Sequence, residues 1–210
     1  MAIVFAKLLV GYLLGSLSGS LLLGRLRGLD IRRHGSGNAG GTNALRVAGW
    51  RFALGVVVVD VGKGALAAWI GADPQLQAHS SMRADVLGAA CAFAAVLGHC
   101  WPLFFGFRGG KGAGTAVGGV LVLAPQFAVP MFGAWVLVIA ITRYVGLATV
   151  LAALAFPLFV TGAAVLGWPQ PVSLQVFAVA IAALIVFTHR ANLQRMQRGE
   201  EPRLTRGGWR

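Results

Sequence analysis

Long apolar runs separated by short polar segments fill this chain from end to end. Seven of them are expected to form helices: Ile3–Leu23, Phe52–Ala72, Ala84–Phe105, Ala113–Ala124, Phe127–Ile141, Val145–Gly167 and Val172–Thr188. A helix of about 20 residues, rising ~1.5 Å per residue, crosses the roughly 30 Å hydrocarbon core of a bilayer. The pattern therefore predicts an all-α, polytopic membrane helix bundle with seven transmembrane helices.

The first apolar run has some features of a cleavable secretory signal. Lys7 precedes an apolar stretch, and small residues at Ser16 and Ser18 mimic a cleavage site. The run is nevertheless 21 residues long, whereas the apolar region of a signal is usually about half that length. We therefore expect a retained membrane span.

The distribution of basic residues sets the number of spans and their direction. Gly112 to Thr142 is long enough for one tilted helix, but Pro125 and Pro130 interrupt it. With seven spans and the N-terminus outside, 15 of the 18 Lys and Arg residues fall in the inside loops and C-terminal tail. A single helix here would move the arginine-rich tail outside. We therefore predict a cytoplasmic C-terminus and a single membrane domain over residues 1–210, leaving open how deeply Ala113–Ala124 inserts.

The composition agrees with a membrane protein. Apolar residues make up 57% of the chain, charged residues 11%, and the mean hydropathy is +0.76. A net charge of +12 would point to nucleic acid in a soluble protein, but here the basic residues lie between apolar runs, so no nucleic acid partner is expected. Cys91 and Cys100 share one apolar run without zinc-type spacing. We read them as buried thiols and expect neither a metal nor a cofactor.

The first inside loop is dense in groups that bind anions. Gly35, Gly37 and Gly40 formally match the dinucleotide fingerprint, but no strand precedes them, so a Rossmann site is rejected. Glycines allow backbone amides to converge on an oxyanion, and an arginine presents a planar fork to phosphate. The polar donors of this loop are Ser36, Asn38, Thr42, Asn43 and Arg46. A flexible glycine-rich connector is the alternative interpretation.

A second glycine-rich loop, Gly109 to Gly112, contains Lys111 directly before a predicted helix. It lacks the residues of a Walker A loop. The amides of residues 110–112 would face an anion, with the helix dipole and Lys111 behind them. The alternative is a basic anchor at the membrane interface.

Two further polar groups stand out in the apolar sequence. His189 and Asn192 are spaced i and i+3 at the end of the last apolar run and share a face if the helix continues. The alternative is that His189 only forms hydrogen bonds at the membrane interface, beside arginines that bind lipid headgroups. Asp60 and Lys63 have the same spacing inside a predicted span, where an unpaired charge is costly. We expect Asp60 and Lys63 to form a structural ion pair that faces the bundle interior, and support of a functional site is the alternative interpretation.

Three motifs in this order, over nearly the whole chain, resemble the bacterial acyl-phosphate:glycerol-3-phosphate acyltransferase family, usually called PlsY. The matching residues are Gly35-Ser36-Gly37-Asn38, Thr42-Asn43, Arg46, Gly98-His99, Pro102, Gly109-Gly110-Lys111-Gly112, His189, Asn192, Arg195 and Glu201-Pro202. The resemblance implies a bacterial inner-membrane enzyme whose active-site loops face the cytoplasm. It implies transfer of a fatty acyl group from acyl phosphate to the 1-hydroxyl of glycerol 3-phosphate, giving lysophosphatidic acid and phosphate.

The resemblance also implies which residues act. The functional core would be Ser36, Arg46, Lys111, His189 and Asn192. Substrate-binding or loop-organising positions would be Gly35, Gly37, Asn38, Thr42, Asn43, Gly109, Gly110, Gly112 and Glu201.

The expected partners are glycerol 3-phosphate, fatty acyl phosphate and membrane lipids, and no protein partner is identifiable. Either His189 or the substrate's own phosphate would take the proton from the attacking hydroxyl. An anion transporter or channel, and a structural protein with a basic lipid-binding face, are the rival classes.

Overall fold

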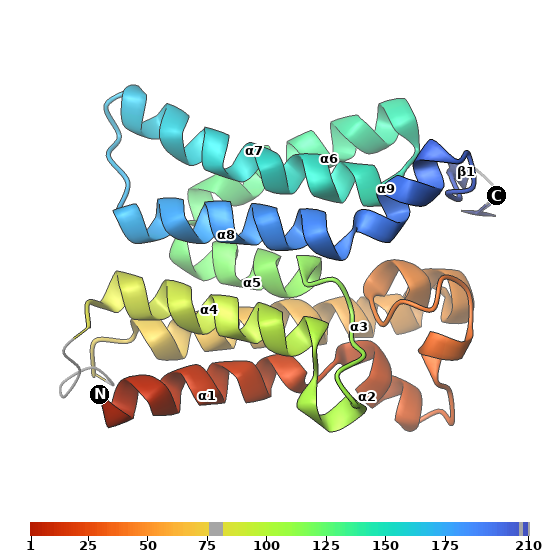
Figure 1. Cartoon of the computed structure of the whole chain (residues 1–210), viewed down its shortest axis with the longest axis horizontal. Helices are drawn as coiled ribbons and strands as arrows, with labels where there is room; N and C mark the ends of the chain where they lie inside the picture. Colours follow the sequence, from red (N-terminus) through yellow and green to blue (C-terminus); the bar gives the residue numbers. More distant parts are fainter. Residues whose placement is uncertain (76–81, 206–207, 210) are drawn as a thin grey trace. The chain divides into compact units, whose positions relative to one another are not determined.

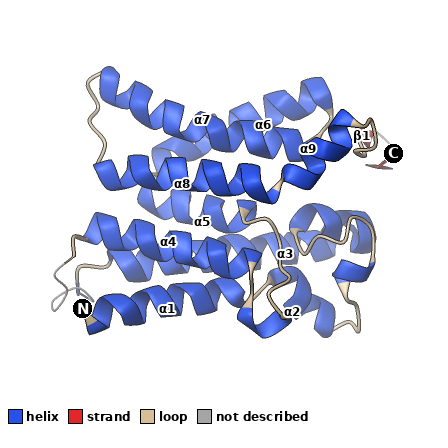
Figure 2. Ribbon diagram, viewed as in Figure 1, coloured by secondary structure: helices blue, strands red, loops and turns tan. Residues whose placement is uncertain are grey.

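Most of the described chain is helical. The computed structural model describes residues 1–75, 82–205 and 208–209, and Figure 2 shows helices joined by short loops. Contacts along the chain divide it into two compact units, Met1–Leu123 and Ala124–Arg210. Each unit is described by itself.

The first unit is built around one long helix. Its helices are α1 (Ala2–Ser16), α2 (Gly19–Arg25), α3 (Gly41–Ala72), α4 (Ala84–Cys100) and α5 (Ala113–Leu123). In this unit α3 packs against α5, α4, α1 and α2, and α1 also packs along α4 (Figure 1). Glycines allow these close approaches: a Cβ at Gly64 would collide with the backbone of Thr115, and one at Gly118 with the backbone of Val61.

The second unit combines apolar helices with a short polar helix, α9. It contains a 3₁₀ turn (Pro125–Phe127), α6 (Ala128–Thr142), α7 (Val145–Val165), α8 (Val172–Thr188) and α9 (Arg190–Gln197). Helix α7 packs against both α6 and α8, and the ring of the fully buried Phe156 lies beside those of Phe127 and Phe177. A two-residue antiparallel pair, β1 (Leu204–Thr205) with β2 (Gly208–Trp209), is the one departure from all-α structure among the described residues.

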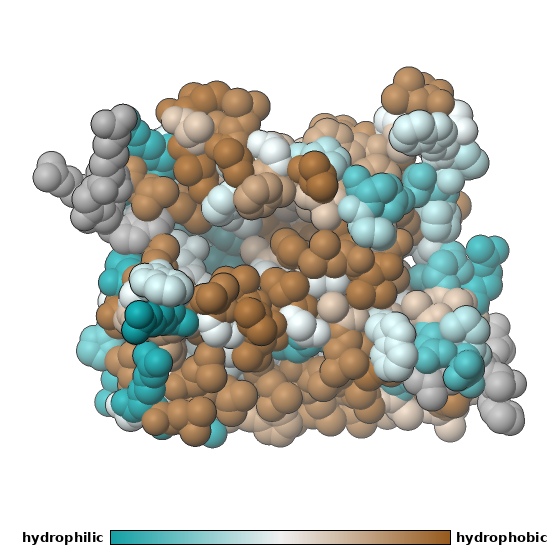
Figure 3. All heavy atoms as spheres, turned by 180° about the vertical axis from the view of Figure 1, so that it is seen from behind, coloured by the Kyte–Doolittle hydropathy of each residue, from teal (hydrophilic) through white to brown (hydrophobic). Residues whose placement is uncertain are grey.

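Several helices are long and apolar enough to cross a membrane. Among the described residues, four helices are long and apolar enough on their own. The number rises to six if the bent pairs α1 with α2 and α8 with α9 each count as one span. Large apolar side chains are exposed on the surface, as the brown areas of Figure 3 show, and Phe132, Leu158 and Val165 are examples. Helix α5 has only 11 residues, about 16 Å, which is shorter than a hydrocarbon core.

The structure corrects three helix boundaries. The expected first span is two helices, α1 and α2, bent by 54° at Leu17 and Ser18. Helix α3 begins at Gly41 instead of Phe52 and contains a kink at Gly49, whose φ of 78° requires glycine. Helix α4 ends at Cys100 instead of Phe105. Helix α8 has the predicted bounds, Val172–Thr188, and α9 is bent from it by 51°. A break at Leu17 and Ser18 is tolerated because polar groups of α3 bind the backbone there, as described below.

The predicted Asp60–Lys63 ion pair is confirmed. Lys63 Nζ lies 2.8 Å from Asp60 Oδ1, and the side chains of Lys63 and Asp60 are only 5% and 4% exposed. The pair faces the interior of the first unit, as expected for charges within an apolar segment.

Two glycines on α3 test how tightly this unit is packed. A methyl group at Gly71 would lie 2.6 Å from Leu87 O, whereas one at Gly62 would meet nothing within 4 Å. We expect Gly71→Ala to lower the free energy of unfolding by about 1–3 kcal/mol. The matched Gly62→Ala should be neutral or slightly stabilising. Thermal unfolding of both variants in one detergent measures the difference, and equal midpoints would contradict the packing.

Candidate active site

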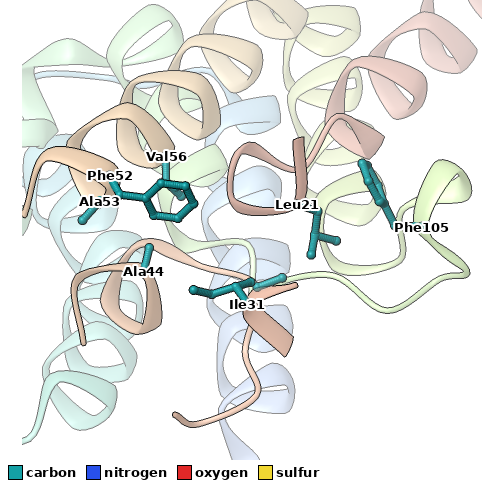
Figure 4. Packing of buried hydrophobic residues seen from close by; sticks show 8 residues of the cluster. Leu21, Ile31, Ala44, Phe52, Ala53, Val56 and Phe105 are labelled. Carbon is teal, nitrogen blue, oxygen red and sulfur yellow. The ribbon is translucent and has the colours of Figure 1, made fainter. Parts of the chain in front are cut away.

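The first glycine-rich loop, residues 26–40, is anchored by apolar side chains. Ile31 and Ala39 are fully buried and join a cluster with Leu21, Phe52 and Phe105. Figure 4 shows Ile31 between Leu21 of α2 and Ala44 of α3. The loop is therefore a packed element, which argues against the flexible connector.

An ion pair between Asp30 and Arg32 also stabilises this loop. Asp30 Oδ2 accepts a 2.9 Å hydrogen bond from Arg32 Nη2, and Asp30 Oδ1 accepts from Arg32 Nε at 3.0 Å. The hydrogen bond from the Arg32 side chain lowers the pKa of Asp30 below its usual range. Arg32 Nη1 also donates to the carbonyl oxygens of Phe105 and Arg108, at 3.0 and 3.3 Å. Arg32 thus ties the first loop to the second.

Asn43, at the start of α3, organises the glycine turn. Its Nδ2 donates to Ile31 O at 3.1 Å and His34 O at 3.0 Å, and its Oδ1 accepts from Ser36 N at 2.9 Å. The residue is 1% exposed. Gly35 packs directly on this amide with a φ of 60°, which favours glycine. Asn43 therefore holds Ser36 in place through its backbone, while Ser36 itself is exposed.

The remaining predicted residues of the first motif lie close to this turn. Gly37 and Asn38 belong to the same loop, and Thr42 and Arg46 lie one turn apart on α3. Residues i and i+4 share a helix face, so Thr42 and Arg46 project together from the first turns of α3. Thr42 is exposed and Arg46 is partly buried.

The second glycine-rich loop folds back on the end of α4. Gly109 N donates to Cys100 O and Gly110 N donates to His99 O, both at 3.1 Å. The amide of Gly110 is therefore engaged in holding the loop, contrary to the expectation that it faces an anion. Gly112 has a φ of 89° and its carbonyl accepts from Ala116 N, so α5 starts directly after Gly112, two residues beyond Lys111.

The two loops meet at Gly110. A Cβ on Gly110 would lie 2.7 Å from Ala39 O and would collide with the ring of His99. Only glycine fits between the first loop and this histidine. The structure thus brings the first two sequence motifs together within the first unit, with Lys111 beside the point of contact.

The third motif lies in the second unit as a group of its own. His189 is 6% exposed, and its Nδ1 lies 2.9 Å from Ile185 O. A carbonyl oxygen only accepts hydrogen bonds, so this contact places a proton on Nδ1 and makes Nε2 the basic nitrogen of the neutral ring.

Glu201 connects Asn192 to the chain that follows α9. Asn192 Nδ2 donates to Glu201 Oε1 at 2.6 Å, and Arg195 Nε donates to Glu201 Oε2 at 2.8 Å. The Glu201 side chain is 9% exposed. Gly146 of α7 packs against Asn192, where a Cβ would lie 3.1 Å from that of the asparagine. These contacts fix the orientation of the Asn192 amide.

Comparison with known protein families identifies the family of this chain. The model of the family described as "Glycerol-3-phosphate acyltransferase" matches residues 5–199. The chain belongs to the glycerol-3-phosphate acyltransferase family. All three motifs fall inside the matched range except Glu201 and Pro202, which lie two and three residues beyond it.

Curated relatives share both the family and nearly the full length. A glycerol-3-phosphate acyltransferase of Chlorobaculum parvum is 40% identical over 225 aligned positions, covering 96% of this chain and 97% of the relative. One of Shewanella woodyi is 39% identical over 206 positions, covering 98% and 95%.

Solved structures of the family have the same fold. The crystal structure of PlsY, an integral membrane glycerol 3-phosphate acyltransferase, in its glycerol 3-phosphate form has a TM-score of 0.84 and 35% identity, covering 96% of both chains. The lysophosphatidic acid form has a TM-score of 0.82 and 34% identity, covering 96% of this chain and 95% of that one. With its apolar helices, this acyltransferase is a multi-pass membrane protein.

Sequence reasoning missed a basic pocket of about 430 Å³ in the first unit. Its lining residues are Leu21, Arg25, Gly28, Leu29, Asp30, Arg32, Arg33, His34 and Phe105. The Arg25 guanidinium lies over the Phe105 ring, 4.5 Å from its centroid. None of the residues predicted for the site lines this pocket. Within residues 1–75, 82–205 and 208–209, no group of three or more His, Cys, Asp or Glu side chains is placed to hold a metal ion.

The role of Asn43 can be tested by an isosteric change. Asn43→Asp keeps the side-chain size but removes both N–H donors and buries a carboxylate next to two carbonyl oxygens. We expect a loss of stability on the order of 2–4 kcal/mol and faster hydrogen exchange in residues 31–36. Mass spectrometry of exchange in detergent measures the second effect. Wild-type exchange rates in that segment would show that Asn43 does not hold the loop.

Proposed function

We propose that this acyltransferase moves a fatty acyl group from acyl phosphate to the 1-hydroxyl of glycerol 3-phosphate. The products are lysophosphatidic acid and inorganic phosphate. The observation that supports this most directly is the likeness, over 96% of the chain, to a family member whose structures are known in a glycerol 3-phosphate form and a lysophosphatidic acid form. The meeting of two glycine-rich loops beside Lys111 gives that likeness a chemical basis for binding phosphate groups.

Two phosphate-bearing reactants need charge stabilisation and orientation. In this mechanism Arg46, Ser36 and Lys111 hold the phosphate groups. His189 and Asn192 orient the glycerol 3-phosphate hydroxyl, with the Asn192 amide fixed by Glu201. The substrate-binding set also includes Gly35, Gly37, Asn38, Thr42, Asn43, Gly109, Gly110, Gly112 and Glu201.

The reaction then requires no covalent enzyme intermediate. The hydroxyl oxygen attacks the acyl carbon, the bond from that carbon to the phosphate oxygen breaks, and phosphate leaves with the electron pair. The hydroxyl proton passes to His189 Nε2 or to a substrate phosphate, whose second pKa is near 6. An acyl phosphate already contains a good leaving group, so the enzyme's main contribution is positioning and electrostatic stabilisation.

The proposed topology has seven spans in the bacterial inner membrane. Up to six spans are supported by their length and composition, and the shorter α5 is proposed as the seventh membrane segment. With the N-terminus outside, the glycine-rich loops and the C-terminal tail lie in the cytoplasm, where glycerol 3-phosphate is available. The arrangement satisfies the positive-inside rule, and the acyl chain would lie among the apolar helices and membrane lipids.

Lys111 provides the sharpest test of this function. Lys111→Ala should lower phosphate release from palmitoyl phosphate and glycerol 3-phosphate by roughly 10²–10³-fold, because it removes a cation aimed at developing negative charge. Arg83→Ala is the matched control, since Arg83 pairs with Asp85 at the other end of α4 and should leave the rate unchanged. Both variants are purified in detergent, and their fold is checked by thermal unfolding.

Two outcomes would count against the proposal. Undiminished phosphate release by Lys111→Ala would remove Lys111 from the mechanism. Absence of turnover by the folded wild-type protein, with uptake of an anion into vesicles, would replace the enzyme by a transporter.

A further inference from the structure

A buried polar cluster lies where four elements of the first unit meet. The Asp60 carboxylate of α3 accepts hydrogen bonds from Lys63 Nζ at 2.8 Å and from Gly19 N, the start of α2, at 3.0 Å. His99 Nδ1 of α4 lies 3.3 Å from the same oxygen. Asp60, Lys63 and His99 are only 3%, 6% and 3% exposed. The proposed mechanism uses none of these three residues.

The Lys63 ammonium group, which has three N–H donors, lies close to three polar atoms: Asp60 Oδ1, Leu17 O at 3.1 Å and His99 Nδ1 at 2.9 Å. According to the tautomer of its ring, His99 Nδ1 accepts from Lys63 Nζ or donates to Asp60 Oδ1. Lys63 and Asp60 also bind backbone groups of Leu17 and Gly19 that the break between α1 and α2 leaves without helical partners.

His99 extends from this cluster to the second glycine-rich loop. Its Nδ1 faces Lys63 and Asp60, while its Nε2 faces Gly110 so closely that a Cβ there would collide with it. The backbone oxygen of His99 also accepts the N–H of Gly110 at 3.1 Å. On its other side Gly110 faces Ala39 O. The ring of His99 therefore sets how far Gly110 stands from α4.

The cluster also supports the helix that follows the loop. Gly114, in the first turn of α5, packs on Asp60, where a Cβ would lie 3.4 Å from that of the aspartate. Residues 109–112 are thus bracketed by His99 before them and by the Asp60 contact after them. A displacement of either support moves Lys111, which lies between the two.

We propose that Asp60, Lys63 and His99 are positioning residues that fix the Gly109–Gly112 loop, and with it Lys111, for binding a substrate phosphate. The inference rests on the proposed function, in which Lys111 binds phosphate. A buried ion pair is weak evidence for stability, because replacing both partners by neutral residues is often tolerated. Its contacts with the loop give this cluster a role in geometry that an apolar replacement cannot supply.

Steady-state kinetics separate positioning from simple stabilisation. KM does not depend on how much of the protein is folded, so a purely structural loss lowers apparent kcat and leaves KM unchanged. We expect His99→Gln to raise KM for glycerol 3-phosphate at least tenfold. Gly71→Ala is the destabilised reference, since its packing defect lies away from the loop, and its KM values should equal those of the wild type.

Two further variants keep the test open if His99→Gln does not fold. Asp60→Asn combined with Lys63→Met removes both charges together, and Gly110→Ala displaces the loop from the opposite side while the charges remain. Both should show the same rise in KM. Wild-type KM and kcat per folded molecule in these variants would overturn the positioning role.

A binding measurement distinguishes failure of this inference from failure of the proposed function. Isothermal titration with glycerol 3-phosphate should give a Kd at least tenfold weaker for His99→Gln than for the wild type. If the wild type binds glycerol 3-phosphate but releases no phosphate from palmitoyl phosphate, the proposed function fails while the titration still decides the positioning role. If the wild type does not bind glycerol 3-phosphate, the proposed function and the positioning role are both contradicted.

Discussion

The contacts of the buried Asp60 carboxylate hold together α2, α3 and α4 of the first unit. Lipid offers no hydrogen bonds, so a helix broken in an apolar segment must find partners for its backbone within the protein. Lys63 and Asp60 supply partners at Leu17 and Gly19, which allows the chain to bend by 54° between α1 and α2. The same pair holds His99, and so connects the bend to the loop beside Lys111.

A second constraint acts at the glycines, where backbone meets backbone or a buried ring. Gly35 fits on the Asn43 amide and Gly110 fits between Ala39 and His99, and a side chain at either place would separate the elements. The two glycine-rich loops are consequently rigid and mutually supported. A rigid cradle suits phosphate binding, because groups that are already placed need no reorganisation when negative charge develops.

The sequence predicted the helices and the motifs better than the connections among them. Apolar runs give reliable helices because membrane spans must pair all their backbone groups internally, and the Asp60–Lys63 pair followed from its spacing along one helix. His99 joins that pair from a position 36 residues away, so its contact depends on how α3 packs against α4. The sequence placed the start of α3 too late, because the first turn of this helix contains residues that favour turns. In the structure, tertiary hydrogen bonds of Asn43 stabilise this turn as part of the helix.

The two glycine-rich loops of the first unit are the proposed phosphate site. Hydrogen exchange of the wild-type protein, measured with and without saturating glycerol 3-phosphate, tests it most directly because the ligand itself marks the segments it contacts. With the ligand bound, we expect slower exchange in residues 35–46 and 109–115, which contain Ser36, Arg46 and Lys111. Protection confined to other segments, with both loops unchanged, would contradict it.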